Sequence, residues 1–378
     1  MDLARTLVVT NDFPTRKGGI EAFVAALCER FEPDDVVVYT ASMPGDREYD
    51  ATLPYPVVRD RSSMLLPTPR VRRDVVAAFR EHGCDRVLFG ASAPLGLLAK
   101  PLKDAGAQRA VAITHSAEVW WAKVPGTNRV MRAIGERVDV LTYISGFTRD
   151  AIARALTPGG RAKQQRLTPG VDSTRFYPGV GGDEVRARLG IPADAPVAVS
   201  SGRLVERKGQ DTVIEAWPRV LAAVPQARLL IVGDGPYRPT LEKLVDERGL
   251  RSSVLFTGAV PWADVPPYVD AGDVFVMPSR TRLRGLEPEG LPLVFLEAAS
   301  CALPVVVGRS GGAPDSVEDG VTGVVVDPLS RDEIAARLVE LLTDRERSAQ
   351  MGAKGRERAL TGWQWDSIAA TCREYLGL

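Results

Sequence analysis

The sequence predicts an α/β fold with two doubly wound parallel sheets, and three observations support this prediction. The chain has 378 residues, which suits two domains better than a single core. Short runs of β-branched residues alternate with helical patterns along its whole length, as in parallel α/β proteins. A turn-rich stretch from Pro169 to Gly182 separates two such series and is the expected hinge.

Two series of strands are expected, one on each side of this hinge. The first comprises residues 6–10, 36–39, 86–89, 110–114 and 140–144. The second comprises residues 197–201, 228–232, 254–257, 274–277, 305–307 and 323–326. We therefore place one Rossmann-like domain at residues 1–176 and another at residues 177–362.

The composition narrows the class of protein. The 48 basic residues are balanced by 48 acidic ones, so no global field would recruit nucleic acid. The four cysteines show no paired spacing, which disfavours a disulfide frame or a zinc site. The N-terminal apolar run is too short for a signal peptide, and no run is long enough to cross a bilayer. We expect a cytoplasmic protein.

In doubly wound sheets, ligands bind beyond the carboxyl ends of the strands. In the first domain, the loop after the first strand ends in Gly18-Gly19, where backbone could approach a phosphate or a sugar. A flexible connection is the alternative reading of this loop. His115 follows the strand at residues 110–114, which favours a ligand-binding role as much as a structural imidazole.

The second domain offers charged residues at matching positions. Arg203 and Lys208 follow its first strand and suit the two phosphates of a nucleotide diphosphate, although any basic cluster can be a solvated surface. Glu289 and Glu297 lie eight residues apart, about 12 Å along a helix, and could hold hydroxyls of one elongated ligand. Between them, Gly290, Leu291, Pro292 and Leu293 lead into an apolar helix, with Pro292 in its first turn and free amides facing a diphosphate.

Other nucleotide-dependent classes lack their fingerprints. The strand-end turns at residues 233–237 and 310–315 do not complete G-x-G-x-x-G, and no P-loop is present. A dinucleotide oxidoreductase and an ATPase are therefore disfavoured.

Taken together, the motifs resemble those of retaining glycosyltransferases of the GT-B fold, family 4. The resemblance rests on Asn-Asp-Phe-Pro with Gly18-Gly19, Thr114-His115, Arg203 to Gln210, Ile231-Val-Gly-Asp-Gly, the spaced Glu289 and Glu297, and Ser310-Gly-Gly-Ala-Pro. Within the family, the stretches at residues 64–69, 89–95, 139–145, 278–282 and 363–365 are most similar to bacterial GDP-mannose-dependent phosphatidylinositol mannosyltransferases. The resemblance implies two Rossmann-like domains facing across a cleft, with the C-terminal helix, residues 363–378, packing back on the first domain.

The resemblance also implies a role for each candidate residue. Gly19, beside Gly18, would meet the donor diphosphate through its amide, and Arg203 and Lys208 would neutralise the departing charge. Glu289 would hold hydroxyls of the sugar, and Glu297 would hold the ribose. His115 would contact the transferred sugar, and Asp12 would lie beside the acceptor. No metal or other cofactor is expected, because the cationic side chains stabilise the leaving group, and no protein nucleophile is required.

The resemblance leads us to expect transfer of mannose from GDP-mannose to phosphatidylinositol or a phosphatidylinositol mannoside. One alternative is another donor, such as a UDP-sugar, with a soluble natural-product or cyclitol acceptor. A second alternative is a noncatalytic protein that binds a sugar nucleotide. The acceptor side departs from the pattern of these mannosyltransferases at Ser116-Ala117 and Trp120-Trp121, and Asp315 replaces their usual glutamate.

A lipid acceptor would require contact with a membrane. Residues 59–73 mix apolar and basic side chains and could touch an anionic bilayer at the inner face of the plasma membrane. An amphipathic helix packed on its own domain would show the same pattern.

Overall fold

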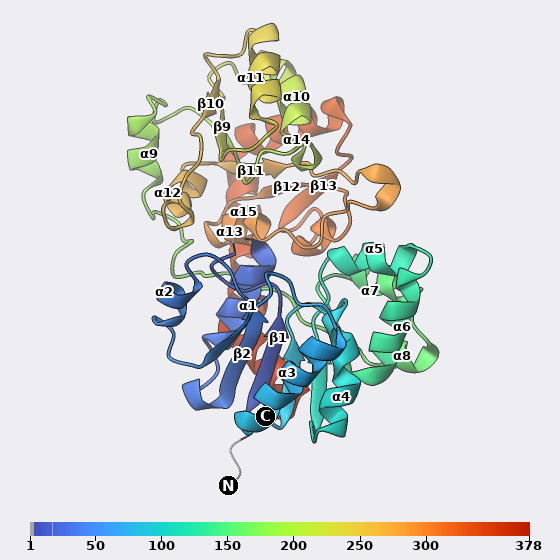
Figure 1. The fold of residues 1–378 in the computed structure, drawn as a ribbon. Helices are drawn as coiled ribbons and strands as arrows, with labels where there is room; N and C mark the ends of the chain where they lie inside the picture. Colours follow the sequence, from blue (N-terminus) through green and yellow to red (C-terminus); the bar gives the residue numbers. More distant parts are fainter. Residues whose placement is uncertain (1–3, 17) are drawn as a thin grey trace. The chain divides into compact units, whose positions relative to one another are not determined.

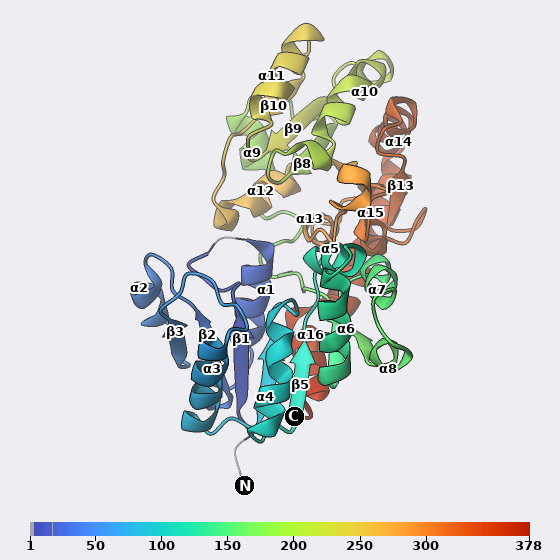
Figure 2. The same cartoon turned by 45° about the vertical axis from the view of Figure 1, so that its right-hand side comes forward.

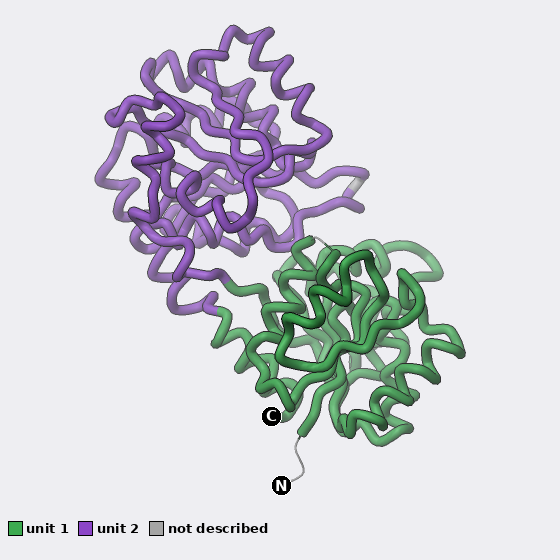
Figure 3. Tube along the Cα trace, turned by 60° about the vertical axis from the view of Figure 1, so that its left-hand side comes forward, with its two compact units in different colours: residues 1–170, 365–378 green, residues 171–364 purple. Residues whose placement is uncertain are grey.

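The computed structural model describes residues 4–16 and 18–378, with the backbone alone at residue 284. The chain forms two compact units, residues 1–170 with 365–378 and residues 171–364 (Figure 3). Each unit is a parallel sheet with helices on both faces (Figures 1 and 2). These are the two Rossmann-like sheets that the alternating pattern predicts.

Within the described residues, the first unit has a seven-stranded parallel sheet of order β3-β2-β1-β4-β5-β6-β7. Its inner strand β1 pairs Leu7 with Val37 on one side and with Val87 on the other. The strands are β1 (Thr6–Thr10), β2 (Val36–Ala41), β3 (Val57–Asp60), β4 (Arg86–Phe89), β5 (Arg109–Ala112), β6 (Val140–Tyr143) and β7 (Gln164–Arg166). The helices are α1 (Gly19–Cys28), α2 (Asp46–Asp50), α3 (Pro69–Glu81), α4 (Ala99–Asp104), α5 (Ala117–Lys123), α6 (Thr127–Arg137), α7 (Gly146–Ala153), α8 (Pro158–Ala162) and α16 (Trp365–Leu376).

Both faces of this sheet are buried, because successive residues of a strand point to opposite faces. Leu7 packs in one core with Val75 of α3 and Ile134 of α6. Its neighbour Val8 packs in the other core with Leu27 of α1. Helix α16, although last in the chain, contributes Ile368, Ala369, Cys372 and Leu376 to this second core. The first unit is therefore completed by the end of the chain.

Strands β3 and β7 were not expected, and both lie at the edges of the seven-stranded sheet. Strand β7 consists of Gln164, Gln165 and Arg166, so it carries no apolar signal. Strand β3 follows Pro56 and has only two apolar residues. Edge strands are commonly short and polar, which makes them hard to find from hydrophobic patterns.

The second unit has, within the described residues, a six-stranded parallel sheet of order β10-β9-β8-β11-β12-β13. Trp217 is fully buried on one face of this sheet, and Phe295 is fully buried on the other. The strands are β8 (Val197–Ser201), β9 (Arg228–Val232), β10 (Val254–Phe256), β11 (Val274–Met277), β12 (Val305–Gly308) and β13 (Gly323–Val326). The helices are α9 (Gly182–Arg188), α10 (Gln210–Ala223), α11 (Arg238–Glu247), α12 (Val265–Asp270), α13 (Val294–Ser300), α14 (Arg331–Thr343) and α15 (Arg345–Gly362).

The division between the units falls after Gly170, six residues before the expected boundary at residue 176. Phe176 explains the difference, because it packs in the second unit's core with Val185 and Val199. The chain returns to the first unit at Trp365, whose ring closely approaches Gly170. A Cβ at Gly170 would lie 2.7 Å from Trp365 Cδ2, so a larger residue would disturb this contact.

Candidate active site

In the second unit, two charged candidates and a glycine turn follow the carboxyl ends of three adjacent strands. Lys208 lies in the loop after β8, Glu289 in the loop after β11, and Gly311 in the loop after β12. These loops touch backbone to backbone: a Cβ at Gly311 would lie 2.1 Å from the carbonyl oxygen of Glu289. Gly311 also has a φ of 53°, which favours glycine. The parallel sheet therefore places all three loops at the carboxyl end of its strands.

Lys208 and Glu289 form an ion pair, with Lys208 Nζ 2.9 Å from Glu289 Oε1. Glu289 is only 4% exposed, and Arg207 Nη1 lies 3.7 Å from the same oxygen. Glu289 Oε1 nevertheless accepts no hydrogen bond of good geometry from any described residue. A buried carboxylate oxygen in this state can accept hydrogen bonds from a ligand, and sugar hydroxyls are donors of the required kind.

The backbone of Glu289 is fixed by the loop after β12. Its amide donates to Ser310 Oγ at 3.4 Å, and its carbonyl accepts from the Gly312 amide at 3.0 Å. Ser310 Oγ also lies 2.9 Å from Thr281 Oγ1. The side chain of Glu289 is therefore presented from a backbone held on both sides.

Gly290, Leu291 and Pro292 are buried, and helix α13 begins after them at Val294. The expectation that Pro292 lies in the first helical turn is wrong, because Leu293 is the N-cap and Pro292 precedes it. No side chain caps this helix start. The first amides of a helix have no partner within it, so they remain suited to an anion. With seven residues, α13 has only a modest dipole, and the amides themselves would do the binding.

Glu297 lies in the first turn of α13 and is 9% exposed. Burial raises the pKa of Glu297 to about 7, and Trp262 opposes this rise. The carboxyl group therefore keeps its proton to a higher pH than an exposed glutamate does, which the sequence did not reveal. Its expected contact with a ribose remains a prediction.

Arg203 is exposed and, among the described residues, has no hydrogen-bond or ion-pair partner. The structure thus brings Lys208 and Glu289 together and leaves Arg203 outside their ion pair. Arg207, which sequence reasoning missed, is the second cation near Glu289. The only signal for it was its place directly before Lys208. A shared action of Arg203 and Lys208 on a diphosphate remains a prediction.

In the first unit, His115 follows β5 and is 5% exposed. Its Nε2 lies 2.8 Å from the carbonyl oxygen of Gly90, and its ring meets Phe23 edge to face. Because a carbonyl oxygen can only accept, Nε2 carries the proton of the neutral ring. Nδ1 is then the nitrogen that can accept a hydrogen bond.

Glu118, which no prediction singled out, holds the backbone at His115. The His115 amide donates to Glu118 Oε2 at 2.8 Å, and Ser92 Oγ donates to Oε1 at 3.2 Å. Glu118 is 2% exposed and lies in the first turn of α5. The sequence contained no standard capping signal for this contact, because the N-cap of α5 is Ser116 and Glu118 lies only two residues after it.

Asp12, the expected acceptor residue, lies in the loop after β1. Burial raises the pKa of Asp12, Glu21 adds to the rise, and His115 opposes it. These interactions place Asp12 in the same electrostatic environment as His115. Among the described residues, no group of three or more His, Cys, Asp or Glu side chains is placed to hold a metal ion.

Gly18 is the N-cap of α1, and Gly19 is its first residue. Gly18 is extended, with a φ of 174°, and a Cβ there would lie 2.2 Å from Glu21 Oε2. Gly19 is exposed, and a Cβ there would have no described atom within 4 Å. The space beside Gly19 is compatible with the close approach of a ligand to its amide, which remains a prediction.

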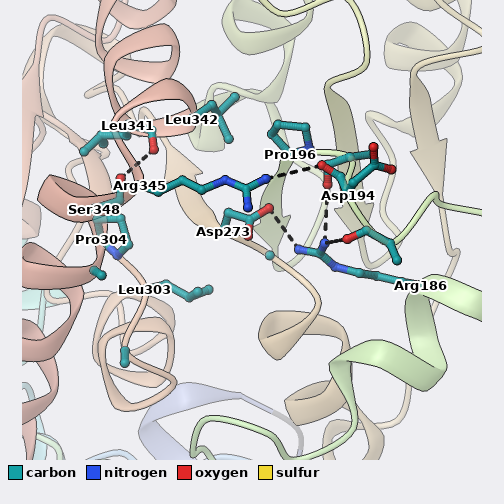
Figure 4. A pocket seen from close by; sticks show the side chains of 15 residues that line it. Arg186, Asp194, Pro196, Asp273, Leu303, Pro304, Leu341, Leu342, Arg345 and Ser348 are labelled. Atoms are coloured by element: carbon teal, nitrogen blue, oxygen red, sulfur yellow. Dashed lines mark hydrogen bonds and ion pairs between the residues drawn. The ribbon is translucent and has the colours of Figure 1, made fainter.

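A separate cavity of about 290 Å³ lies in the second unit and contains none of the predicted site residues (Figure 4). It is lined by residues directly before β8, β11 and β12, at the amino ends of these strands. The guanidinium of Arg186 is occupied there, donating to Asp273 Oδ2 at 2.9 Å and to the Ala271 carbonyl at 2.8 Å. This cavity lies at the wrong end of the sheet for a nucleotide.

Comparisons with known proteins match both halves of the chain to glycosyltransferase families. Residues 182–358 match the family described as "Glycosyl transferases group 1", and residues 17–175 match "Glycosyltransferase Family 4". The chain is 43% identical to a GDP-mannose-dependent alpha-(1-6)-phosphatidylinositol monomannoside mannosyltransferase of Mycolicibacterium smegmatis, over 98% of this chain and 97% of that one. It is 42% identical to a GDP-mannose-dependent monoacylated alpha-(1-6)-phosphatidylinositol monomannoside mannosyltransferase of Corynebacterium glutamicum, over 96% and 95% of the two chains.

Solved structures share the fold at lower sequence identity. The crystal structure of Anabaena Alr3699/HepE in complex with UDP superposes with a TM-score of 0.83, at 21% identity and 99% coverage of both chains. Sucrose-phosphate synthase from Thermosynechococcus elongatus gives a TM-score of 0.75, at 23% identity and 98% coverage of both. The chain therefore belongs to family 4 of the glycosyltransferases, enzymes of the GT-B fold.

Proposed function

We propose that the protein transfers mannose from GDP-mannose to a hydroxyl of a phosphatidylinositol mannoside, with retention of the anomeric configuration. The proposal is supported by relatives above 40% identity whose names specify this donor and a phosphatidylinositol monomannoside acceptor. These relatives match almost the whole chain, including the loops that carry the candidate residues.

The observation that carries the proposal is the buried pair of Lys208 and Glu289. Glu289 Oε1 accepts no hydrogen bond of good geometry from the described residues, so hydroxyls of a hexose can bond its remaining lone pairs. Lys208 Nζ, 2.9 Å away, supplies positive charge beside the same sugar. In this arrangement, the carboxylate orients the sugar while the ammonium faces the charge of the departing diphosphate.

The reaction then needs no nucleophile from the protein. The bond between the anomeric carbon and the diphosphate breaks, and the acceptor hydroxyl forms a bond to the same face. Its proton passes to an oxygen of the leaving diphosphate. Electrostatic stabilisation of that leaving group lowers the barrier by several kcal/mol, so we propose that cations of the protein act here in place of a metal.

Incubation with a panel of donors and acceptors tests the proposal. Purified protein is mixed with GDP-mannose, UDP-glucose or ADP-glucose, each with phosphatidylinositol, its monomannoside or free inositol, and products are identified by mass spectrometry. We expect addition of one hexose to the monomannoside from GDP-mannose. Transfer from a UDP-sugar to the soluble acceptor, or donor binding without any product, would contradict the proposal.

We further propose that the protein works in the cytoplasm, in peripheral contact with the anionic inner face of the plasma membrane, where a lipid acceptor lies. No helix among the described residues is both long and apolar enough to span a bilayer. The surface expected for membrane contact, residues 59–73, is less basic than its sequence indicates. Arg59 pairs with Asp50 at 2.7 Å, and Arg70 pairs with Asp60 at 2.8 Å.

Helices α5 to α8 lie together at one side of the first unit (Figure 2), and their exposed residues are more basic. Between residues 117 and 166, seven exposed side chains are basic and only Glu136 and Asp150 are both exposed and acidic. The seven are Lys123, Arg129, Arg132, Arg149, Arg154, Arg161 and Arg166, of which Arg149 pairs with Asp150 at 2.7 Å. Trp120 on α5 is 41% exposed, and tryptophan favours the interface between water and lipid. We propose this surface for the contact with anionic lipid.

Flotation with lipid vesicles separates the two surfaces. We compare Arg129→Gln/Arg132→Gln with the matched pair Arg72→Gln/Arg73→Gln, using phosphatidylglycerol vesicles and neutral phosphatidylcholine vesicles. The first pair should reduce binding to phosphatidylglycerol more than the second. Equal binding to both kinds of vesicle would contradict the membrane proposal.

A further inference from the structure

The loop between β11 and Glu289 is fastened to the turn that carries Lys208. We call residues 280–288 the 280–288 hairpin, because Arg282 and Glu287 pair across it. The Arg282 amide donates to the Glu287 carbonyl at 3.2 Å, and the Glu287 amide donates back at 3.3 Å. The hairpin ends directly before Glu289, so its position determines where the backbone of Glu289 lies.

Arg280 fastens the base of the hairpin. Its amide donates to the carbonyl oxygen of Arg207 at 2.8 Å, which joins the hairpin to the residue before Lys208. Its guanidinium bonds both carboxylate oxygens of Asp211, at 2.9 and 2.7 Å, in the first turn of α10. The Arg280 side chain is 13% exposed, so this bidentate contact is largely shielded from water.

A second ion pair fastens the hairpin nearer its tip. Arg282 Nη2 lies 2.6 Å from Glu206 Oε2, two residues before Lys208. The other Glu206 oxygen lies 3.6 Å from Arg280 Nη2. Both partners of the outer pair are partly exposed, at 35% for Arg282 and 42% for Glu206. Glu206 therefore receives both arginines of the hairpin.

We infer that Arg280 and Arg282 are positioning residues, which set the distance between Lys208 and Glu289 by holding the hairpin against residues 206–208. Neither arginine belongs to a hydrophobic core cluster of the second unit. Arg282 contacts Glu206 and Glu287 of the two loops. Arg280 joins these loops to each other and to Asp211 at the start of α10. The inference rests on the proposed function, because it assumes that Lys208 and Glu289 bind the donor sugar.

Charge exchange at the outer pair tests the inference. The variants are Glu206→Arg, Arg282→Glu and the double exchange, which restores an ion pair of reversed direction. The matched control is Arg219→Glu, which breaks the exposed pair between Arg219 and Asp332 at 2.8 Å. We measure the Kd for GDP-mannose by calorimetry, kcat and KM with a mannoside acceptor, and the melting temperature.

Each single exchange should raise the Kd and the KM for GDP-mannose by about fivefold or more, the scale of one partly exposed ion pair with added repulsion. The melting temperature should change little, and kcat should fall with the affinity because Lys208 is displaced from the leaving group. The double exchange should recover part of both, since the introduced arginine would still face Arg280. The Arg219→Glu control should bind as the unmodified protein does.

Three results would overturn the inference. They are unchanged affinity in both single variants, a loss of affinity that follows the melting temperature, and a double exchange that binds no better than its parents. Calorimetry measures donor affinity without an acceptor, so it distinguishes a failure of this inference from a failure of the proposed function. A protein that binds GDP-mannose but transfers nothing would contradict the function, while the affinities would still test the hairpin.

Discussion

Lys208 and Glu289 meet at 2.9 Å in the second unit, although they belong to loops that follow different strands. The parallel sheet brings these loops to the carboxyl end of its strands, and the 280–288 hairpin holds them together. The pair combines a buried carboxylate with a nearby ammonium, which suits a neutral sugar attached to an anionic leaving group.

Removal of the ammonium should affect catalysis more than folding. For Lys208→Met, we expect kcat to fall by about a hundredfold or more, because a charge that stabilises the leaving group is lost. Glu289 would remain buried without its partner, so stability should fall by about 1–3 kcal/mol. Steady-state kinetics and denaturant unfolding measure the two effects. A folded variant with nearly normal turnover would remove Lys208 from the mechanism.

Gly19→Ala separates ligand binding from backbone conformation. The added methyl group would have no described atom within 4 Å, so the melting temperature should not change. If the Gly19 amide meets the donor diphosphate, the methyl group should raise the KM for GDP-mannose. Gly18→Ala is the comparison, because its methyl group would have to displace the Glu21 carboxylate. Unchanged KM in Gly19→Ala would exclude close contact of the donor at this amide.

Glu297 should make stability depend on pH. Its pKa is about 7 in the folded protein, against a usual value of 4.5, so the folded state binds more protons between these values. Stability from this group is therefore complete below about pH 4.5 and is lost as the pH rises to about 7. Glu297→Gln should reduce this slope and should melt higher than the unmodified protein at pH 8. Parallel melting curves of the two proteins from pH 5 to pH 8 would contradict the buried carboxyl.

Glu118 should matter for the placement of His115. Glu118→Ala leaves the buried His115 amide and Ser92 hydroxyl without their acceptor, which should cost about 1–3 kcal/mol. Glu118→Gln keeps an acceptor oxygen for the amide and should cost less. Urea unfolding of both variants checks this order. Equal stability of the two would show that the carboxylate is not the support of His115.

Hydrophobic patterns were sufficient to predict the eleven strands that carry strong apolar runs, because both faces of each sheet are buried. The edge strands β3 and β7 lacked that signal. The meeting of Lys208 and Glu289 could be anticipated from the rule that ligand-binding loops follow strand carboxyl ends. No local pattern indicated the partners of Arg280, since Asp211 lies far away in the sequence.

The sequence did not reveal which charged side chains are buried or held in ion pairs. Arg59 and Arg70 read as free cations of a membrane surface, yet each is held by an aspartate. Glu297 read as a charged end of a helix, yet burial raises its pKa to about 7. Such properties depend on which side chains surround a residue in three dimensions.

Calorimetric titration of Glu289→Gln with GDP and with GDP-mannose tests the central proposal most directly. Glutamine keeps the size of the side chain but replaces the charged carboxylate by a neutral amide. The carboxylate oxygens should accept hydrogen bonds from the hydroxyls of the sugar. We predict that the variant binds GDP as tightly as the unmodified protein and loses affinity for GDP-mannose by about tenfold, as expected for hydrogen bonds to a charged group. Equal affinity of both proteins for GDP-mannose would show that Glu289 does not hold the sugar.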